Sequence, residues 1–313
     1  MLSEGFFQQL NHTVTDDELR FLDENGYVLL RRNSKYWNDA GLDLNSVAEF
    51  LDEIPNTERI TPDDQNDDRK KVEAGAVRHT NLVGQNTMFA EFVVNPDILK
   101  CVNSVIGNDF VLSSMDMREP KKGSGWQGLH QDIPQRKTSG DQFMQCTAFI
   151  FLDDYSEING AIRVVPKSHK EFVHIKSFSH IRSKRTRSDD EVIEKLDAES
   201  SLTLSGAKGD ILILNVNTFH GGSTNHSGER RRVLFLNYRN RALRQQLCQF
   251  DHIPREEQSK MGEVQKAILH LYPPTAIERL KRFAYHNRHK PIVVCMMSVK
   301  KFVFRLLPKM FAR

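Results

Sequence analysis

The sequence predicts a mainly β fold with flanking helices, arranged as a double-stranded β-helix, that is, a cupin-like jelly roll. From residue 110 onward, short β-rich runs follow one another, and turns such as Asn159-Gly160 and Gly221-Gly222 separate them. Several of these runs are continuously apolar, which predicts sheets covered on both faces with helices as the outer layer. The runs are FVLSSMDM, CTAFIFL, AIRVV, SLTL, DILILNV and RRVLFLNY.

The region before residue 110 is expected to be mainly helical. The residues TDDE at 15–18 have the spacing of a capping box, and NG at 25–26 is a typical helix end, so a helix is expected between them. YVLL at 27–30 predicts a short strand. A second helix is expected over 95–107, because Asn-Pro opens it and apolar residues follow at helical spacing. The polar segment 61–71 predicts a solvated loop.

The length of 313 residues suits either one large domain or two small ones. The β-rich runs predict a jelly-roll core at about 110–240, and a basic tail follows at 279–313. A net charge of +3 argues against a nucleic-acid partner. The four cysteines are scattered without a C-x-x-C pair, and the N-terminus lacks the apolar core of a signal peptide. A cytoplasmic location is therefore expected.

A candidate metal site begins at LHQD. His130 and Asp132 stand at i and i+2, so both side chains could reach one ion from one face of a strand. With 12 histidines in the chain, however, one such pair is expected by chance about as often as not, and His169 and Glu171 form a second. The spacing alone decides nothing, and a third ligand is required.

His220 is the candidate third ligand, because it ends the apolar strand DILILNVNTFH. In a jelly roll, a return strand ending here would bring His220 beside His130. Two imidazoles and one carboxylate hold Fe(II) from one side and leave positions open for a bidentate co-substrate and dioxygen. Taken singly, His220 is better explained as a polar residue that caps its strand.

Arg231 favours the metal interpretation. It follows His220 across a glycine-rich turn, so a returning strand would place its guanidinium near the metal, where it could hold a carboxylate in a bidentate clamp. Strand alternation puts Arg231, Val233 and Phe235 on one face, and Arg230 and Arg232 on the other. The alternative is a solvated basic edge made of all three arginines.

These residues resemble the motifs of the phytanoyl-CoA dioxygenase family of non-haem iron, 2-oxoglutarate-dependent oxygenases, which includes ectoine hydroxylase. The similar segments run through most of the chain. They are FLDENGYVLLRR, LHQD, INGAIRVVPKSHK, and GDILILNVNTFHGGSTN followed by Arg231. The resemblance also implies that His169 belongs to the SHK turn and is not a ligand.

The resemblance implies that residues 1–278 form an oxygenase domain in which His130, Asp132 and His220 bind Fe(II) and are the catalytic residues. Arg231 would hold the far carboxylate of 2-oxoglutarate. With dioxygen, the enzyme would hydroxylate a C–H bond of a small-molecule or lipid-linked substrate and release succinate and CO₂.

Two positions depart from the family pattern. Gly222 stands where the family usually has a serine that helps to hold 2-oxoglutarate, and Lys167 replaces the glycine of the PGSH turn. The first departure leaves the second anchor of the co-substrate open. Ser223, Thr147 and Ser113 are candidates to replace it.

Two other classes of protein fit the same pattern. A jelly roll with a degenerate site could serve as a binding or scaffold domain, and a cupin-type metalloenzyme would not need 2-oxoglutarate. The substrate is not encoded in a readable motif. Loops 120–129 and 133–142 and the N-terminal helices are expected to contact it. Gln131, Arg136 and Lys137 could meet an anionic group, although a solvated loop explains them as well.

The tail is basic and apolar at once. After Glu278 there are ten Lys or Arg and no acidic residue, interleaved with PIVVCMMSV and FVF. Such a segment can lie on an anionic membrane, with roughly 1 kcal/mol from each basic residue near the surface. It can equally form an amphipathic helix on the domain or on a second subunit of a homo-oligomer. The membrane alternative would suit a lipid-linked substrate.

Overall fold

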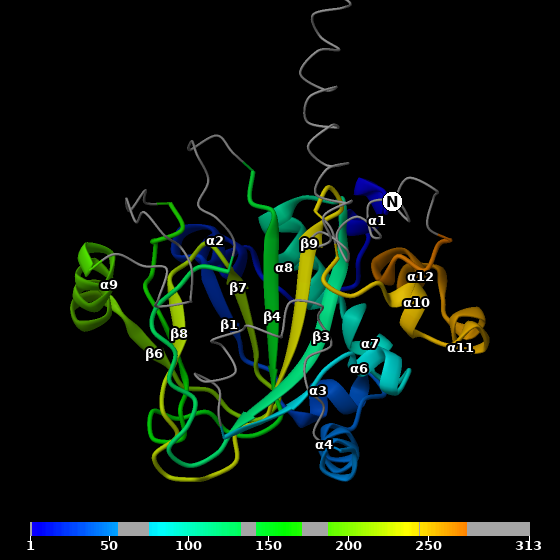
Figure 1. The fold of residues 1–313 in the computed structure, drawn as a ribbon. Coiled ribbons are helices and arrows are strands. Elements are labelled where there is room, and N and C mark those ends of the chain that lie inside the picture. Colours follow the sequence, from blue (N-terminus) through cyan, green and yellow to red (C-terminus); the bar gives the residue numbers. More distant parts are fainter. Residues whose placement is uncertain (1, 56–74, 133–141, 171–186, 244, 274–313) are drawn as a thin grey trace, which may run out of the picture. The chain divides into compact units, whose positions relative to one another are not determined.

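The computed structural model describes residues 2–55, 75–132, 142–170, 187–243 and 245–273 (Figure 1). Residues up to Leu271 form one compact unit. The predicted loop at 61–71, most of the loop at 133–142, and the basic tail at 279–313 lie outside the described residues. The domain boundary at 278 and both alternatives for the tail therefore stay predictions. No helix in the described ranges is long and apolar enough to cross a membrane.

Two antiparallel sheets form the predicted jelly roll. The larger sheet has the order β1-β7-β4-β9-β3-β2, and the smaller has the order β6-β5-β8. The larger sheet contains β1 (Tyr27–Leu30), β2 (Ala76–His79), β3 (Phe110–Pro120), β4 (Gln145–Phe151), β7 (Ile211–Asn215) and β9 (Val233–Asn240). The smaller sheet contains β5 (Ile162–Val164), β6 (Leu202–Leu204) and β8 (His220–Gly222). Each of the six predicted β runs thus contains a strand. Neither β2 nor β8 was predicted: Gly221 and Gly222, expected to form a turn, pair with β5 as part of β8.

The predicted helices begin and end where local chemistry requires. In α2 (Asp16–Asn25) the Thr15–Glu18 capping box is present, and Gly26 ends the helix at φ 80°, in the left-handed region that glycine tolerates. Helix α8 (Pro96–Ile106) begins at Asn95, whose side chain accepts two backbone hydrogen bonds. The other helices are α1 (Glu4–Gln8), α3 (Ser34–Asp39), α4 (Leu44–Glu53), α6 (Leu82–Gln85), α7 (Phe89–Val93), α9 (Arg187–Ser200), α10 (Gln249–His252), α11 (Arg255–Lys260) and α12 (Glu263–Leu269).

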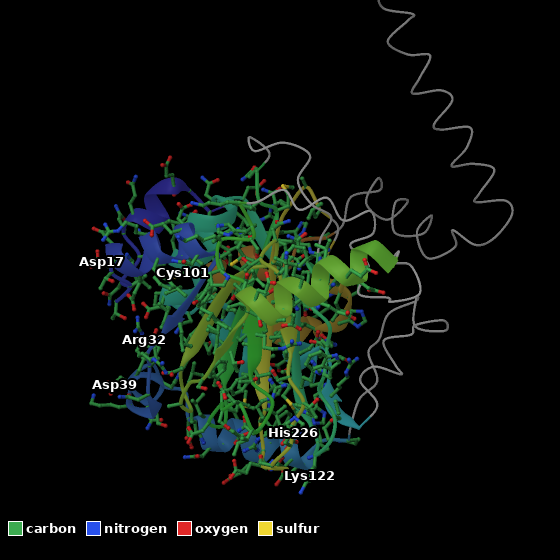
Figure 2. All side chains as sticks on the ribbon, turned by 90° about the vertical axis from the view of Figure 1, so that its left-hand side faces the viewer. Asp17, Arg32, Asp39, Cys101, Lys122 and His226 are labelled. Carbon is green, nitrogen blue, oxygen red and sulfur yellow. The ribbon has the colours of Figure 1, made fainter. Side chains whose placement is uncertain are left out.

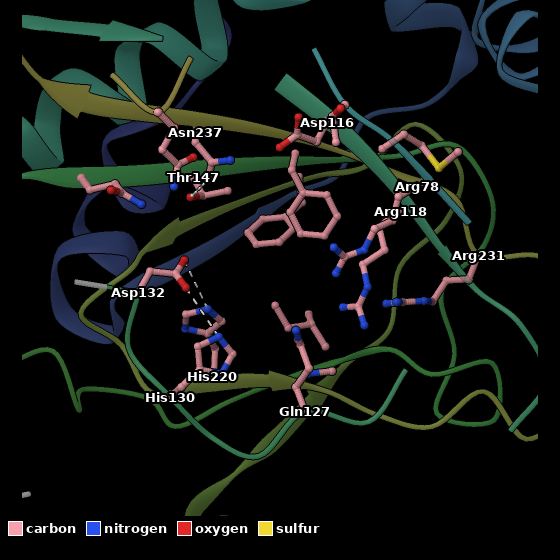
Figure 3. Close-up of a pocket in the computed structure, with 18 of the residues that line it drawn as sticks. Arg78, Asp116, Arg118, Gln127, His130, Asp132, Thr147, His220, Arg231 and Asn237 are labelled. Atoms are coloured by element: carbon pink, nitrogen blue, oxygen red, sulfur yellow. Dashed lines mark hydrogen bonds and ion pairs between the residues drawn. The ribbon is translucent and has the colours of Figure 1, made fainter. Parts of the chain in front are cut away.

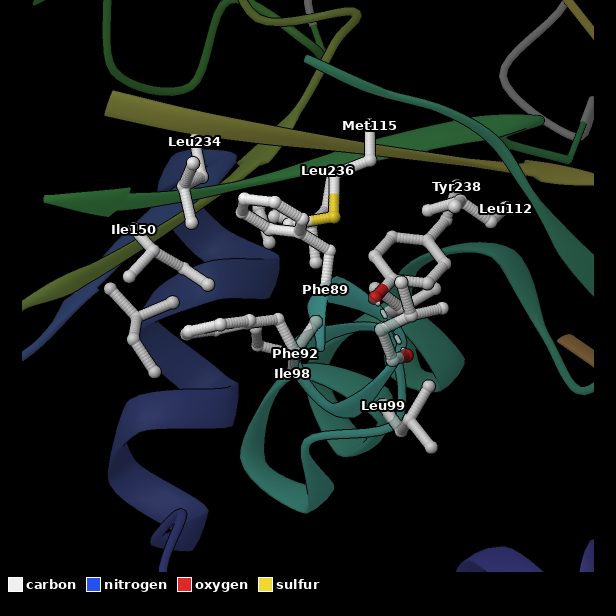
Figure 4. Packing of buried hydrophobic residues seen from close by; sticks show 14 of the residues in the cluster. Phe89, Phe92, Ile98, Leu99, Leu112, Met115, Ile150, Leu234, Leu236 and Tyr238 are labelled. Carbon is white, nitrogen blue, oxygen red and sulfur yellow. Dashed lines mark hydrogen bonds between the residues drawn. The ribbon is translucent and has the colours of Figure 1, made fainter. Parts of the chain in front are cut away.

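The main core lies between one face of the larger sheet and the N-terminal helices. Figure 4 shows Phe89, Phe92 and Ile98 packed beneath Leu234 and Leu236 of β9. The opposite face of the larger sheet turns toward the smaller one, where a second apolar cluster joins the two. Both faces of the sheet are covered, as expected, but helices form only one of the two covers.

A buried ion pair ties the N-terminal segment to this core. Asp97 in α8 accepts hydrogen bonds from the backbone N of Thr13 (2.6 Å), the hydroxyl of Thr13 (2.7 Å) and Nε of Arg32 (2.8 Å). Arg32 and Cys101 are both labelled in Figure 2, and Cys101 is fully buried. The described cysteines Cys101, Cys146 and Cys248 are free thiols.

Candidate metal and co-substrate site

His130 and His220 face each other across a pair of backbone hydrogen bonds. The N–H of His130 donates to the carbonyl of His220 (2.9 Å), and the N–H of His220 donates to that of His130 (3.0 Å). Nε2 of His130 lies 3.5 Å from one carboxylate oxygen of Asp132, and Nε2 of His220 lies 3.7 Å from the other. The three side chains can offer ligand atoms that all lie within 4.8 Å of one another (Figure 3).

Local hydrogen bonds set both rings for metal binding. Nδ1 of His130 lies 3.0 Å from the carbonyl of Gly128, and Nδ1 of His220 lies 2.9 Å from the carbonyl of Thr218. A carbonyl only accepts, so Nδ1 carries the proton in each neutral ring and the Nε2 lone pair is left for a metal. Burial, and to a smaller extent the nearby His130, lower the pKa of His220 to about 4, so this ring is neutral at physiological pH.

The donor set suits ferrous iron. Two neutral imidazoles and one carboxylate on one side of an ion are the 2-His-1-carboxylate arrangement of non-haem Fe(II) oxygenases. Asp132 is 37% exposed at its side chain, so the space in front of the three ligands is open. Within the described ranges, no other group of three His, Cys, Asp or Glu side chains converges in this way. His169 lies elsewhere, where its Nε2 contacts the carbonyl of Asp23 at 2.9 Å.

A cavity of about 250 Å³ extends from the triad between the two sheets. Phe149 and Phe235 form an apolar wall, with ring centroids 4.9 Å apart, and Ile162 lies on the smaller sheet opposite them. The polar lining residues are Arg78, Thr80, Asp116, Arg118, Gln127, Gln145, Thr147, Tyr155, Arg231, Asn237 and Gln246. Figure 3 shows the arginines at the end of the cavity that lies away from His130 and Asp132.

Arg231 is the member of the arginine triplet that enters the cavity. It is buried, and its guanidinium lies over the ring of Tyr155 at 4.8 Å. Its neighbours turn the other way. Arg230 forms ion pairs with Asp52 and Glu119, and Arg232 with Asp153. The triplet therefore alternates as predicted, although the regular strand begins only at Val233.

Of the three candidates for a second anchor, only Thr147 lines the cavity. Its hydroxyl donates to Oδ1 of Asn237 at 2.8 Å, and Nδ2 of Asn237 donates to Oγ of Ser114 at 3.0 Å. Ser113 is the extra residue of a β-bulge between Leu112 and Ser114, and its Oγ accepts from the backbone N of Gln246 at 2.9 Å. The bulge interrupts the alternation of β3 at Ser113. In addition, β9 lies between β3 and β4, so Ser113 and Thr147 are not on neighbouring strands, contrary to expectation.

Ser223, the remaining candidate, is not among the lining residues; its N–H donates to the carbonyl of Ala161 at 3.1 Å. Gln131 was expected either in a solvated loop or near an anionic group. It is buried, so the solvated loop is wrong for this residue, and its side-chain amide donates to the carbonyl of Asn217. Arg136 and Lys137 lie outside the described residues. From the predicted substrate loops, Gln127 and Gly128 do line the cavity.

Arg78 and Arg118 were missed by sequence reasoning. Arg118 lies one residue beyond the β run that was recognised, and Arg78 lies on β2, where no strand was predicted. They are opposite each other in the register of β2 and β3. The available signal was the alternation of Asp116 and Arg118 with apolar residues along one strand, which predicts that both face the same way.

The triad, the cavity and the jelly roll together define the class of Fe(II)- and 2-oxoglutarate-dependent dioxygenases with an H-x-D…H facial triad. The sequence pattern of the phytanoyl-CoA dioxygenase (PhyH) family matches residues 22–233. The chain belongs to this family, and the resemblance seen in its motifs is confirmed.

A relative from Stutzerimonas stutzeri, described as a probable alpha-ketoglutarate-dependent hypophosphite dioxygenase, is 37% identical over 115 residues. The match covers 35% of this chain and 38% of the relative, so the chain matches well under half of that protein's length.

Two solved structures share the fold. HygX from Streptomyces hygroscopicus, with nickel and 2-oxoglutarate bound, superposes with a TM-score of 0.57 at 16% identity, over 74% of this chain and 90% of HygX. The non-haem alpha-ketoglutarate-dependent carbocyclase SnoK from nogalamycin biosynthesis superposes with a TM-score of 0.53 at 18% identity, over 73% of this chain and 85% of SnoK. The predicted fold class is confirmed by these superpositions.

Proposed function

We propose that this protein hydroxylates a C–H bond of a small-molecule substrate, using Fe(II), 2-oxoglutarate and dioxygen and releasing succinate and CO₂. The observation that carries the proposal is the juxtaposition of a metal-ready triad and a buried cation in one cavity. HygX, a structural neighbour, has been crystallised with nickel and 2-oxoglutarate and with iron, which supports the same choice of cofactor and co-substrate here.

Each residue has a role that follows from its position. His130 and His220 present Nε2 lone pairs, Asp132 supplies a carboxylate, and Arg231 holds the distal carboxylate of 2-oxoglutarate at the far end of the cavity. When bound, iron and 2-oxoglutarate supply the oxidising chemistry that splits dioxygen. The wall formed by Phe149 and Phe235 excludes water from the space where the substrate must lie.

Anaerobic titration tests the proposal. Protein loaded with Fe(II) should develop a visible charge-transfer band as 2-oxoglutarate chelates the metal, and oxygen should then cause succinate to form. A scaffold protein with a degenerate site would show no band, and a cupin-type enzyme would turn over without releasing succinate. Replacing His130 by alanine provides the matched blank.

A small oxyanion is a second candidate for the substrate. The relative from Stutzerimonas stutzeri is described as acting on hypophosphite, and Arg78 adds another guanidinium to the lining of this cavity. A panel of metabolites scored by oxygen-dependent succinate release should therefore include hypophosphite beside neutral and lipid-linked compounds. Stimulation by hypophosphite alone would favour the oxyanion over the C–H substrate.

A further inference from the structure

Arg118, near the end of β3, reaches the same end of the cavity as Arg231. In the register of β3 and β9, Arg118 is opposite Val233, which follows Arg231 by two residues. Arg118 is only 8% exposed, and Figure 3 shows its side chain directed into the cavity toward that of Arg231. The two guanidiniums thus reach one place from β3 and from the segment that leads into β9, the neighbour of β3 in the sheet.

The surroundings of this place favour an anion. Tyr155 interacts with both arginines, and each arginine is buried. Burial lowers the pKa of Arg118 to about 10. Burial, and then the charge of Arg118, lower the pKa of Arg231. Because a guanidinium remains charged at neutral pH, two of them held close together in a buried pocket raise the affinity of that pocket for a carboxylate.

Gly222 lacks the hydroxyl group with which the family usually helps to hold 2-oxoglutarate, so another side chain must replace it. A Cβ at this position would lie 2.6 Å from the carbonyl oxygen of Gly125, which is backbone and cannot swing away. The same Cβ would lie 3.8 Å from Nη1 of Arg118. The family's serine therefore cannot be accommodated at position 222, and the guanidinium of Arg118 lies beside the space that its hydroxyl would have used.

We propose that Arg118 is the second anchor of the distal carboxylate of 2-oxoglutarate, in place of the hydroxyl that the family usually supplies at position 222. The proposal rests on the proposed function, because it assigns one more residue to the same co-substrate. Arg118 from β3 and Arg231 from the segment just before β9 would both hold the carboxylate.

Arg78 offers a matched control. It lies opposite Arg118 on the neighbouring strand, lines the same cavity and carries the same charge. Replacing either residue by alanine removes one positive charge from the cavity. A general electrostatic role would therefore weaken 2-oxoglutarate binding similarly in both variants, whereas a direct contact would make the loss specific to Arg118.

The experiment is an anaerobic titration of the Fe(II)-loaded protein, following the charge-transfer band. Arg118→Ala should require about tenfold more 2-oxoglutarate or more, as expected for a lost charged hydrogen bond, and Arg118→Lys should lie between this variant and the wild type. Arg78→Ala should stay within about threefold of the wild type. Iron binding without 2-oxoglutarate should be the same in all of them, which also shows that they are folded.

Repeating the titration with 2-oxovalerate identifies the group that Arg118 contacts. This compound keeps the chelating 2-oxo acid but has a methyl group in place of the distal carboxylate. Wild type and Arg118→Ala should bind it equally weakly. An Arg118→Ala protein with wild-type affinity for 2-oxoglutarate, or with an equal loss for both compounds, would overturn the second anchor alone. A wild-type protein that shows no band would overturn the proposed function as well.

Discussion

The two faces of the larger sheet are built from the same strands, but only one of them combines apolar side chains with cations and amides. On β9, Leu234, Leu236 and Tyr238 turn toward the helices and are fully buried. The residues between them, Phe235 and Asn237, turn into the cavity. The same holds on β4, where one face contributes to the core and the other to the pocket.

This difference shows what fixes the register of the strands that carry the site residues. Apolar burial on the helix face gives a one-residue shift a large cost, because such a shift would exchange the two faces completely. The opposite face mixes apolar side chains with the cations and amides of the cavity, so it distinguishes the two registers less strongly. Arg231 enters the cavity, whereas Arg230 and Arg232 pair with carboxylates outside the cavity. Which arginine reaches the site therefore depends on packing at the helix face, away from the site itself.

The sharpest test of this division removes a metal ligand. His130→Ala or Asp132→Ala should abolish iron binding and succinate formation, because each supplies one of only three protein ligands. The midpoint of urea unfolding of the metal-free protein should change little. His169→Ala is the control, and it should still bind iron. A variant of His130 that keeps full activity would contradict the triad.

The opposite pattern is expected from the helix face. Leu236→Ala should lower the free energy of unfolding by about 2–5 kcal/mol, because it leaves a cavity in the main core. Below its unfolding transition, this variant should bind 2-oxoglutarate as the wild type does. Asn237→Ala, one residue further along β9, should instead disturb the contact with Thr147 and cost less stability. Denaturant unfolding measures the loss of stability in each variant, and the anaerobic titration measures its affinity for 2-oxoglutarate.

Neighbouring arginines provide the same comparison at the end of the cavity. Arg231→Ala should weaken 2-oxoglutarate binding by about 2–5 kcal/mol, since a buried charged clamp is lost. Arg230→Ala should leave that affinity almost unchanged, because Arg230 is occupied by Asp52 and Glu119. If the two effects were reversed in the titration, the alternation of this segment would be wrong.

The smallest effect concerns pH. Burial alone would raise the pKa of Asp153, but hydrogen bonds from Arg232 outweigh it and hold this pKa below its ordinary value of 3.8. A carboxyl group with a lowered pKa stabilises the fold above its unfolded pKa, and this contribution is lost as the pH falls through the folded value. Asp153→Asn should therefore be less stable at pH 7 by about 1–3 kcal/mol. The difference should shrink below pH 3.8; a constant difference would contradict the linkage.

Sequence patterns predicted the features that depend on local chemistry. Each of these features involves only a few consecutive residues, so the sequence is enough to predict it. Examples are the capping box at Thr15, the left-handed helix end at Gly26 and the alternation around Arg231. The triad was also accessible, because the order of strands in a jelly roll brings His220 back to His130. The phytanoyl-CoA dioxygenase motifs also connect the segment of His130 and Asp132 with the segment of His220 and Arg231.

The missed features depend on contacts between distant segments. The bulge at Ser113 arises from pairing with β9 and with the segment around Gln246, which no local pattern reveals. Arg118 became recognisable as a cavity residue only when β2 and β9 were placed on either side of it. The reason for Gly222 is likewise a carbonyl group that lies nearly a hundred residues away in the chain.

The reciprocal backbone bonds between His130 and His220 have one further consequence. They hold the two Cα positions through main-chain atoms, so the frame that presents the ligands is independent of which side chains it carries. Selection, or a designer, can exchange the coordinating groups on this frame without rebuilding the sheet. The same pair of positions could therefore accept a different metal or a different open coordination site, with Asp132, which stands just beyond the pair, as the first residue to vary.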